Sequence, residues 1–163
     1  MSYTVCVTGH RPDKLFGYNL YDKRYLPIAV NLRNIVLGLL KQYGEVHCIY
    51  GGALGMDQLF GLVVRKLKQQ GYPVTLEVAI PCQNYTSHWK DTTYWDMILP
   101  YCDKETLVSD EPYQAKHMQL RNMYMVDHSD MVIAVYDGYS KGGTRNCIDY
   151  AQNKGKQITY VQI

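Results

Sequence analysis

Six short runs rich in Val, Ile and Thr alternate with amphipathic segments along the chain. The strand-like runs cover residues 3–8, 46–50, 74–80, 105–108, 131–136 and 157–163. Helical periodicity predicts helices over residues 27–41, 56–70, 113–128 and 145–154, with a shorter helix over 92–99 that Pro100 ends. Strands that are apolar over nearly their whole length and alternate with helices are buried on both faces. The sequence therefore predicts an α/β fold, a single doubly wound domain over residues 1–163 with a mainly parallel sheet flanked by helices.

Composition narrows the class of protein. No apolar run approaches the ~20 residues of a membrane span, and no charged and then apolar leader opens the chain. We expect a cytoplasmic protein with no membrane partner. Five scattered cysteines, and the histidines His88, His117 and His128, show no metal-ligand spacing, so we expect no metal. A net charge of +2 without a dense basic stripe makes nucleic acid an unfavoured partner.

Glycine-rich and polar segments follow four of the predicted strands. In chain order they read TGHRPDK, GGALGMD, PCQNY and DGYSKGGT. In an open parallel sheet, ligands bind in the crevice beyond the carboxyl ends of the strands. We therefore expect these four segments to converge on one site.

The segment GGALGMD has two interpretations. Gly51, Gly52 and Gly55 permit a tight turn and close approach to a ligand, and the helix that follows would direct free N–H groups at an anion. Alternatively, Gly51 and Gly52 only end a strand, and Asp57 is a first-turn acid that the helix dipole favours. Glycine spacing alone does not decide between them.

The segment before the last helix repeats this arrangement. Gly142 and Gly143 precede Thr144, whose hydroxyl can cap the helix or contact a phosphate oxygen. Two glycine-preceded helix starts suit a ligand with more than one anionic or hydroxyl-rich part. A nucleotide is the simplest such ligand.

The first segment places Thr8, Gly9, His10 and Arg11 directly after a strand. A guanidinium can grip phosphate with two parallel hydrogen bonds, and an imidazole can contact ribose or transfer a proton. The alternative is an exposed arginine and a histidine bonded to the backbone. We favour ligand binding for Arg11 and leave the role of His10 open.

Arg121 falls on the same helix face as Met118 and Met125, which places a permanent charge beside residues expected to be buried. Such an arginine needs an anionic partner. The partner is either a protein carboxylate, such as Asp127 or Asp130, or a ligand phosphate.

Large aromatic residues follow the third strand. Tyr85 and Trp89 could flank a nucleotide base by stacking, or could pack over the edge of the sheet. For Trp89 we favour packing.

Five segments together resemble the SLOG superfamily of Rossmann-like nucleotide-binding proteins, and within it the bacterial and phage branch with a YpsA-type domain. They are VTGHRPDKLFGY, GGALGMDQ, AIPCQNYTSHW, LRNMYMVDHSDMVIAVYDG and GGTRNCIDYA. The resemblance implies a Rossmann-like sheet with a pocket formed by Gly9, Arg11, Gly51, Gly52, Gly55, Asp57, Asp137, Gly142, Gly143 and Thr144. To these we add Arg121 and Asn122 of the fourth segment as candidates.

From the resemblance we expect a binding protein for a nucleotide or nucleotide-derived signal, ADP-ribose-like or cyclic, that acts as a sensor or, if phage-encoded, as a sequestering protein. No further cofactor is expected. A homo-oligomer is expected from the resemblance and the apolar helix faces.

Two other functions stay open. The first is hydrolysis of an N-glycosidic or phosphoribosyl bond, as in the LOG branch. The glutamate that follows the second glycine-threonine motif there is missing here, where Thr144 is followed by Arg145, Asn146 and Cys147. Asp57 is then the first candidate for a catalytic carboxylate. The second is single-stranded DNA binding, as in the DprA branch, which the mild net charge disfavours.

Overall fold

Six strands form one sheet in the order β4-β3-β2-β1-β5-β6 in the computed structural model, which describes residues 3–163. Every neighbouring pair of strands is parallel. The strands are β1 (Tyr3–Gly9), β2 (Val46–Tyr50), β3 (Val74–Ile80), β4 (Lys104–Leu107), β5 (Met131–Tyr136) and β6 (Gln157–Gln162). All six predicted strands are confirmed, with ends that differ by at most one residue from the expected ranges.

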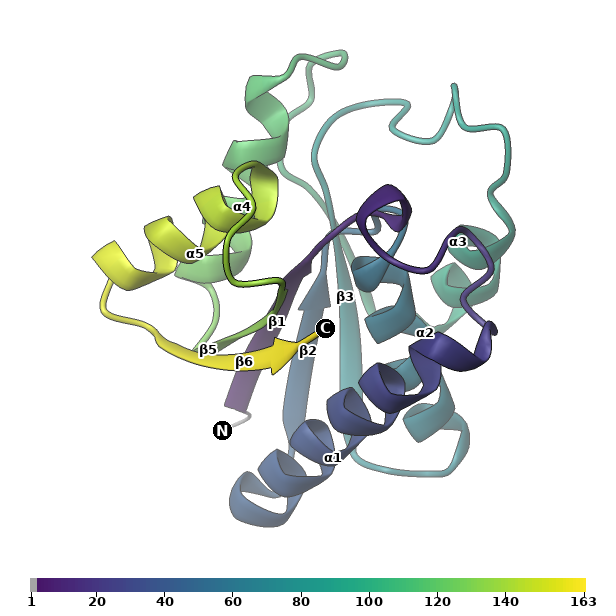
Figure 1. Ribbon diagram of the computed structural model, residues 1–163, viewed down its shortest axis with the longest axis vertical. Helices are drawn as coiled ribbons and strands as arrows, with labels where there is room; N and C mark the ends of the chain where they lie inside the picture. Colours follow the sequence, from purple (N-terminus) through teal and green to yellow (C-terminus); the bar gives the residue numbers. More distant parts are fainter. Residues whose placement is uncertain (1–2) are drawn as a thin grey trace.

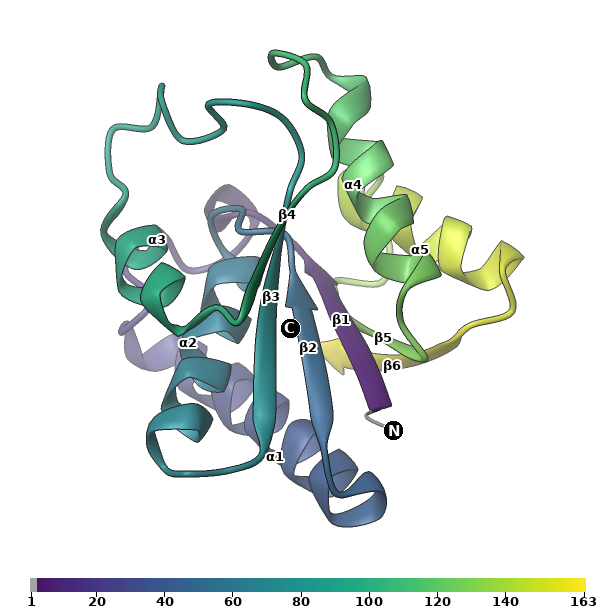
Figure 2. The ribbon, with the colours of Figure 1, turned by 180° about the vertical axis from the view of Figure 1, so that it is seen from behind.

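Within residues 3–163, five α-helices cover the two faces of the sheet. They are α1 (Leu26–Tyr43), α2 (Met56–Gln69), α3 (Thr93–Ile98), α4 (Lys116–Asp127) and α5 (Gly143–Asn153). Helices α1, α2 and α3 lie on one face, and α4 and α5 lie on the other (Figure 1, Figure 2). The predicted doubly wound α/β domain is confirmed. None of the described helices is long and apolar enough to cross a membrane.

Two helices on the second face begin at positions that differ from the prediction. Helix α4 begins at Lys116 rather than at residue 113, because the N–H of Gln114 donates to Nδ1 of His117 at 3.0 Å and forms a local turn instead. Helix α5 begins at Gly143 rather than at residue 145. Gly142 takes the cap position with a φ of 130°, a conformation that L side chains rarely adopt.

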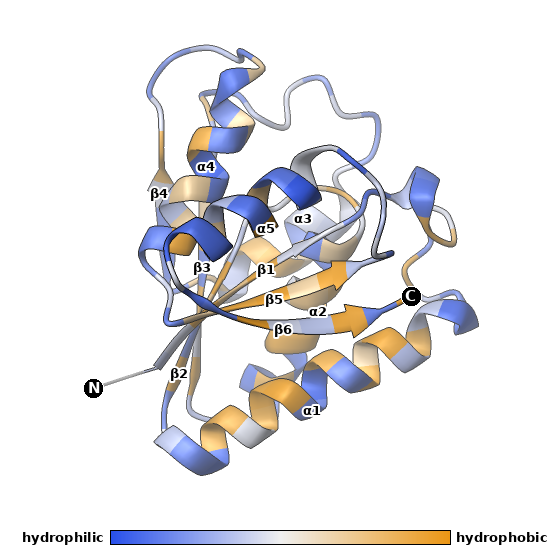
Figure 3. Cartoon of the chain, turned by 60° about the vertical axis from the view of Figure 1, so that its left-hand side comes forward, coloured by the Kyte–Doolittle hydropathy of each residue, from blue (hydrophilic) through white to orange (hydrophobic). Residues whose placement is uncertain are grey.

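The core lies in two layers, because successive strand residues point to opposite faces of the sheet. Val5 and Val7 pack in the layer of α1, α2 and α3, whereas Cys6 packs in the layer of α4 and α5. All three are completely buried. Figure 3 shows hydrophobic and hydrophilic residues alternating along α1, and on this helix Leu32 is also completely buried. Truncating such a side chain to alanine costs ~2–5 kcal/mol.

The strand order reverses beside β1. The chain runs outward from β1 to β4 and then returns to place β5 on the other side of β1. The carboxyl ends of β1, β2 and β3 lie toward the top of Figure 1, where the loops after β1, β3 and β4 rise above the sheet. Loops that separate at such a reversal leave a crevice, and this is where open α/β sheets bind ligands.

Candidate functional site

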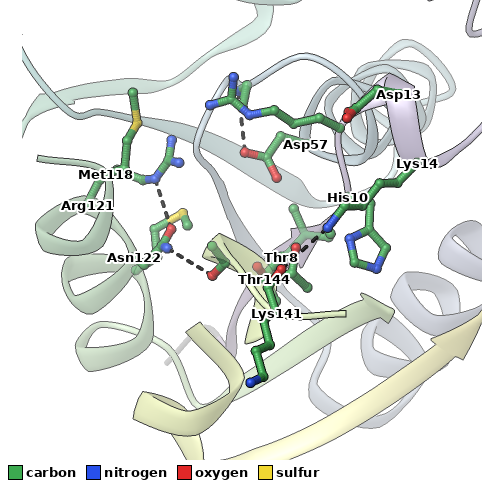
Figure 4. A pocket seen from close by; sticks show the side chains of 16 residues that line it. Thr8, His10, Asp13, Lys14, Asp57, Met118, Arg121, Asn122, Lys141 and Thr144 are labelled. Atoms are coloured by element: carbon green, nitrogen blue, oxygen red, sulfur yellow. Dashed lines mark hydrogen bonds between the residues drawn. The ribbon is translucent and has the colours of Figure 1, made fainter. Parts of the chain in front are cut away.

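A cavity of about 230 Å³ lies beyond the carboxyl ends of β1 and β5, at the reversal of strand order (Figure 4). Four separate parts of the chain form its wall: the loop after β1, the β2–α2 segment, α4 and the start of α5. The predicted site residues that line it are Thr8, Gly9, His10, Arg11, Asp57, Arg121, Asn122, Gly143 and Thr144. Three of the four segments predicted to converge therefore meet at this cavity, whereas PCQNY contributes no residue to it.

Arg121 forms part of this wall although it is only 5% exposed. Its Nη1 donates to the carbonyl of Gly51 at 2.6 Å, and its Nε donates to Oδ1 of Asn122 at 3.1 Å. Within residues 3–163, Arg121 has no carboxylate at ion-pair distance, 4.0 Å or less. The guanidinium charge thus faces the cavity without a direct counter-ion.

The two carboxylates that the sequence offered as partners of Arg121 form hydrogen bonds with other residues. Asp127 accepts a hydrogen bond from the hydroxyl of Tyr150 at 2.8 Å, and Asp130 accepts one from the N–H of Thr4 at 2.8 Å. Both aspartates are exposed. The structure therefore removes these two candidates from the alternatives for Arg121.

Asp57 is a buried carboxylate in this wall. It lies in the first turn of α2, is 6% exposed, and accepts a hydrogen bond from the N–H of Ala53 at 3.3 Å. Burial raises the pKa of Asp57, while the positive charges of Arg121 and Arg11 and the Ala53 amide oppose the rise. Figure 4 shows Asp57 between Arg121 on α4 and His10 in the loop after β1.

The two helix starts at the site differ. At α2 the N–H of Met56 donates to the carbonyl of His10 at 3.2 Å, so the protein itself occupies this end. At α5 the cap residue Gly142 forms no side-chain cap, Gly143 is exposed, and a Cβ on Gly143 would meet no atom within 4 Å. Thr144 lies inside the helix and lines the cavity rather than capping it. Only the α5 start, of these two, is open to an anion.

The glycines after β2 do not line the cavity, but each is in close contact with another part of the chain. A Cβ on Gly51 would lie 2.1 Å from Nη1 of Arg121, and one on Gly52 would lie 2.3 Å from the ring of Trp95. Gly55, with a φ of 95°, has the carbonyl oxygen of His10 2.5 Å from the position of a Cβ. Gly51 thus makes room for Arg121, Gly52 for the ring of Trp95, and Gly55 for the backbone at His10.

Asp137 shapes the loop after β5. Its carboxylate accepts hydrogen bonds from the N–H groups of Tyr139 at 3.0 Å and Ser140 at 2.9 Å, and from the Ser140 hydroxyl. Burial favours the neutral acid, but these hydrogen bonds outweigh it and lower the pKa of Asp137. Asp137 and Gly142 do not line the cavity; they hold the loop that presents Gly143.

His10 connects that loop to β1. Its Nε2 accepts the N–H of Asp137 at 3.2 Å and lies 3.5 Å from Oδ2 of the same residue. Burial lowers the pKa of His10 more than the nearby Asp137 raises it. A hydrogen bond to the backbone was one of the two interpretations of His10, and the structure shows this bond. His10 also lines the cavity.

A second cavity, of about 280 Å³, adjoins the first and shares Arg11 and Met118 with it. Its remaining lining residues are Asn84, Tyr85, His88, Trp89 and Tyr113. The rings of Tyr85 and Trp89 meet edge to face at 5.0 Å, and Trp89 also packs on Trp95 at 5.8 Å. These two predicted stacking residues therefore pack on the core and also border a cavity.

The sequence interpretation did not single out Asp13, Lys14, Ala53 and Lys141, which also line the first cavity. Nζ of Lys14 donates to the carbonyl of Lys141 at 3.4 Å, which joins the loops after β1 and β5. In Figure 4 the ammonium of Lys141 extends away from the cavity. All four residues fall inside or beside the glycine-rich segments, but an isolated loop lysine carries no signal of its own. No group of three or more His, Cys, Asp or Glu side chains between residues 3 and 163 is placed to hold a metal ion.

Comparison with solved structures identifies similar folds. DNA processing protein A (DprA) from Streptococcus pneumoniae superposes with a TM-score of 0.66 at 16% identity, covering 98% of this chain and 50% of that one. DprA from Helicobacter pylori, whose structure concerns its single-stranded DNA binding mode, gives a TM-score of 0.63 at 17% identity, over 97% of this chain and 64% of that one. This chain thus spans only about half to two thirds of those proteins.

Comparison with curated proteins finds relatives of similar length. The SPbeta prophage-derived protein YoqJ of Bacillus subtilis (strain 168) is 34% identical over 140 residues, which are 78% of this chain and 81% of YoqJ. A UPF0398 protein of Ligilactobacillus salivarius (strain UCC118) is 27% identical over 158 residues, 94% of this chain and 85% of that protein. The model of the YspA SLOG family, YpsA, matches residues 5–163. The chain therefore belongs to the YspA SLOG family.

Proposed function

We propose that this protein binds a nucleotide or a nucleotide-derived signalling molecule, ADP-ribose-like or cyclic, and acts as a sensor or a sequestering protein. The observation that carries this proposal is the buried guanidinium of Arg121, which lines a cavity and has no carboxylate within 4.0 Å among residues 3–163. Burying an unpaired charge is costly, so an anion supplied by a ligand would relieve that cost.

The open start of α5 supports the same kind of ligand. The start of α5 has no side-chain cap and presents the positive end of the helix dipole at the cavity wall, to which Arg11 and Lys14 of the β1 loop add positive charge. A phosphate between α4 and α5 would accept hydrogen bonds from Arg121 and from the amides near Gly143. This arrangement favours phosphate over an uncharged ligand.

The two adjoining cavities support a ligand that is longer than a phosphate. Each cavity is smaller than the ~300 Å³ at which small-molecule pockets begin, but together they reach that size. The first is lined by charged groups and the second by aromatic rings. A nucleotide matches this division, with its phosphate and sugar beside Arg121 and its base beside Tyr85 and Trp89.

Thermal unfolding in the presence of ligands tests the proposal. The panel contains AMP, ADP, ADP-ribose, cyclic ADP-ribose isomers and cyclic dinucleotides, because a ligand that binds only the native state raises the melting temperature. We expect at least one to stabilise the wild type, and Arg121→Met to bind it at least ~10-fold more weakly through loss of a charged hydrogen bond.

Arg33→Met is the matched control, since it removes an arginine that stacks on Tyr72, outside both cavities. It should respond to the ligand as the wild type does. A folded wild type that no member of the panel stabilises would contradict the proposal.

Hydrolysis of a nucleotide is a second candidate, which the position of Asp57 in the cavity favours. A carboxylate with a raised pKa beside a phosphate-binding arginine could assist cleavage of a glycosidic bond. Incubation with nucleoside monophosphates and chromatography of the released base separates hydrolysis from binding. Turnover that persists in Asp57→Asn would remove Asp57 from this role.

Single-stranded DNA binding is a third candidate, favoured by the fold that this chain shares with the two DprA structures. A protein that neutralises several phosphates shows affinity that falls steeply as salt rises. Oligonucleotide binding by fluorescence anisotropy between 50 mM and 200 mM salt therefore distinguishes this function from binding of a small nucleotide.

A further inference from the structure

One carboxylate oxygen of Asp57 has no hydrogen-bond partner within residues 3–163. Oδ2 accepts the N–H of Ala53 at 3.3 Å, and no other hydrogen bond or ion pair to Asp57 occurs within residues 3–163. The Asp57 side chain is buried in the cavity wall. Its Oδ1 accepts no hydrogen bond from the described residues, but unlike Oε1 of Gln58 it is not completely enclosed by protein atoms. The free oxygen therefore opens into the cavity.

The charges around Asp57 limit which ligand group can meet that oxygen. A phosphate would be repelled by the carboxylate and attracted to Arg121 and the start of α5. A cationic group would have to enter beside Arg121 and Arg11, whose charges already act on Asp57. A neutral hydrogen-bond donor satisfies a carboxylate oxygen without either cost.

We propose that Asp57 accepts a hydrogen bond from a sugar hydroxyl of the bound nucleotide, so that the cavity selects ribonucleotides over their deoxy forms. This inference rests on the proposed nucleotide binding. Sugar hydroxyls lie only a few bonds from the phosphate, as the cavity requires if Arg121 holds the phosphate and Asp57 lies across from it (Figure 4).

A purely structural role for Asp57 predicts something else. An acid in the first turn of a helix is stabilised by the helix dipole, and it would serve that role equally well with any ligand present. A residue that accepts a hydrogen bond from a ligand hydroxyl changes the relative affinities of ligands that differ only in that hydroxyl. The two roles are therefore separated by comparing ligands and not by stability alone.

The experiment measures binding of AMP, 2′-deoxy-AMP, 3′-deoxy-AMP and 2′,3′-dideoxy-AMP by calorimetry. For the wild type we expect AMP to bind at least ~10-fold more tightly than the dideoxy form, as befits a hydrogen bond to a charged group. Asp57→Asn should lose this preference, with weaker AMP binding and unchanged or improved binding of the dideoxy form. Glu45→Gln, which neutralises an exposed acid before β2, should keep the preference.

Equal affinities of the wild type for AMP and its dideoxy form would overturn the inference, and so would an equal loss for both ligands in Asp57→Asn. The comparison within the wild type does not depend on the folding of any variant. Binding without discrimination would leave the proposed function standing, whereas no binding of any of the four nucleotides, or of the wider panel, would contradict the proposed function itself.

Discussion

Two carboxylates, Glu77 and Asp57, are buried to a similar extent in this protein but have opposite surroundings. Glu77 on β3 is 2% exposed and forms three short contacts: Oε1 lies 2.7 Å from Nε2 of His47, and Oε2 accepts the hydroxyls of Tyr124 at 2.6 Å and Thr106 at 2.7 Å. We call these four residues the Glu77 cluster. Asp57 is 6% exposed and, within residues 3–163, its carboxylate accepts one hydrogen bond, at 3.3 Å.

The pKa values of the two groups move in opposite directions. Burial raises the pKa of Glu77, but hydrogen bonds from His47, Tyr124 and Thr106 outweigh it and hold the pKa at about 2. At Asp57 burial prevails and the pKa rises. A buried charge that the protein satisfies stabilises the fold, whereas one left unsatisfied at a cavity indicates a place for a ligand.

The largest effect is expected inside the Glu77 cluster. Glu77→Gln should lower the free energy of unfolding by ~3 kcal/mol, because it removes the charge that His47 and the two hydroxyls satisfy. Urea denaturation at pH 7 measures this loss, with Glu45→Gln, an exposed acid, as a control expected within ~0.5 kcal/mol of wild type. A loss of less than ~1 kcal/mol would mean that the cluster contributes little to stability.

The contribution of Glu77 to the free energy of unfolding should also depend on pH. Since the folded pKa of Glu77 is about 2 and its ordinary value is 4.5, its contribution is present above pH 4.5 and declines as the pH falls toward 2. Between pH 6 and pH 3 the stability difference between the wild type and Glu77→Gln should shrink by ~2 kcal/mol. Urea titrations at both pH values check this, and a difference that grew on acidification would reverse the assigned sign.

Alanine substitutions at Gly52 and Gly143 compare a closely packed position of the site with an open one. Gly52→Ala should cost ~2 kcal/mol, because Gly52 has a φ of 77° and its Cβ would lie 2.3 Å from Trp95. Gly143→Ala should stay within ~0.5 kcal/mol of wild type, since it meets no atom within 4 Å and begins a helix. Thermal unfolding without ligand measures both, and equal losses would show that the start of α5 is not open.

Among the charged side chains buried in the molecule, Arg121 is expected to contribute less to stability than Glu77. Replacing a buried charge that lacks a carboxylate partner with an apolar residue of similar length is close to neutral, and the lost hydrogen bond to Gly51 costs ~1 kcal/mol. Arg121→Met should therefore stay within ~1 kcal/mol of wild type in urea denaturation without ligand. A loss of free energy of unfolding as large as that of Glu77→Gln would mean that the charge of Arg121 stabilises the fold.

Much of the fold could be predicted because its signals are local. Strand β5 is apolar in every residue, and α2 has both its periodicity and the glycines around it in one short segment. The starts of α4 and α5 were missed by a few residues, because they depend on the side chain of His117 and on the backbone conformation of Gly142. Neither is visible in periodicity.

The Glu77 cluster was not anticipated, although one signal was present. Glu77 is an acid in the middle of an otherwise apolar strand, and such a residue needs partners. Those partners come from β2, β4 and α4, up to 47 positions away along the chain. Sequence spacing alone could not have supplied them.

The sequence by itself determined the alternation of strands and helices, the convergence of its glycine-rich segments at one edge of the sheet, and the family. Periodicity and the direction of parallel strands are enough for those conclusions. Only the tertiary structure decided that Gly51 makes room for Arg121, that Asp137 supports a loop, and that α5 rather than α2 offers an open helix start. The reason is that hydrogen-bond partners and close contacts are set by distances between segments far apart in the chain, and these distances exist only once the sheet has formed.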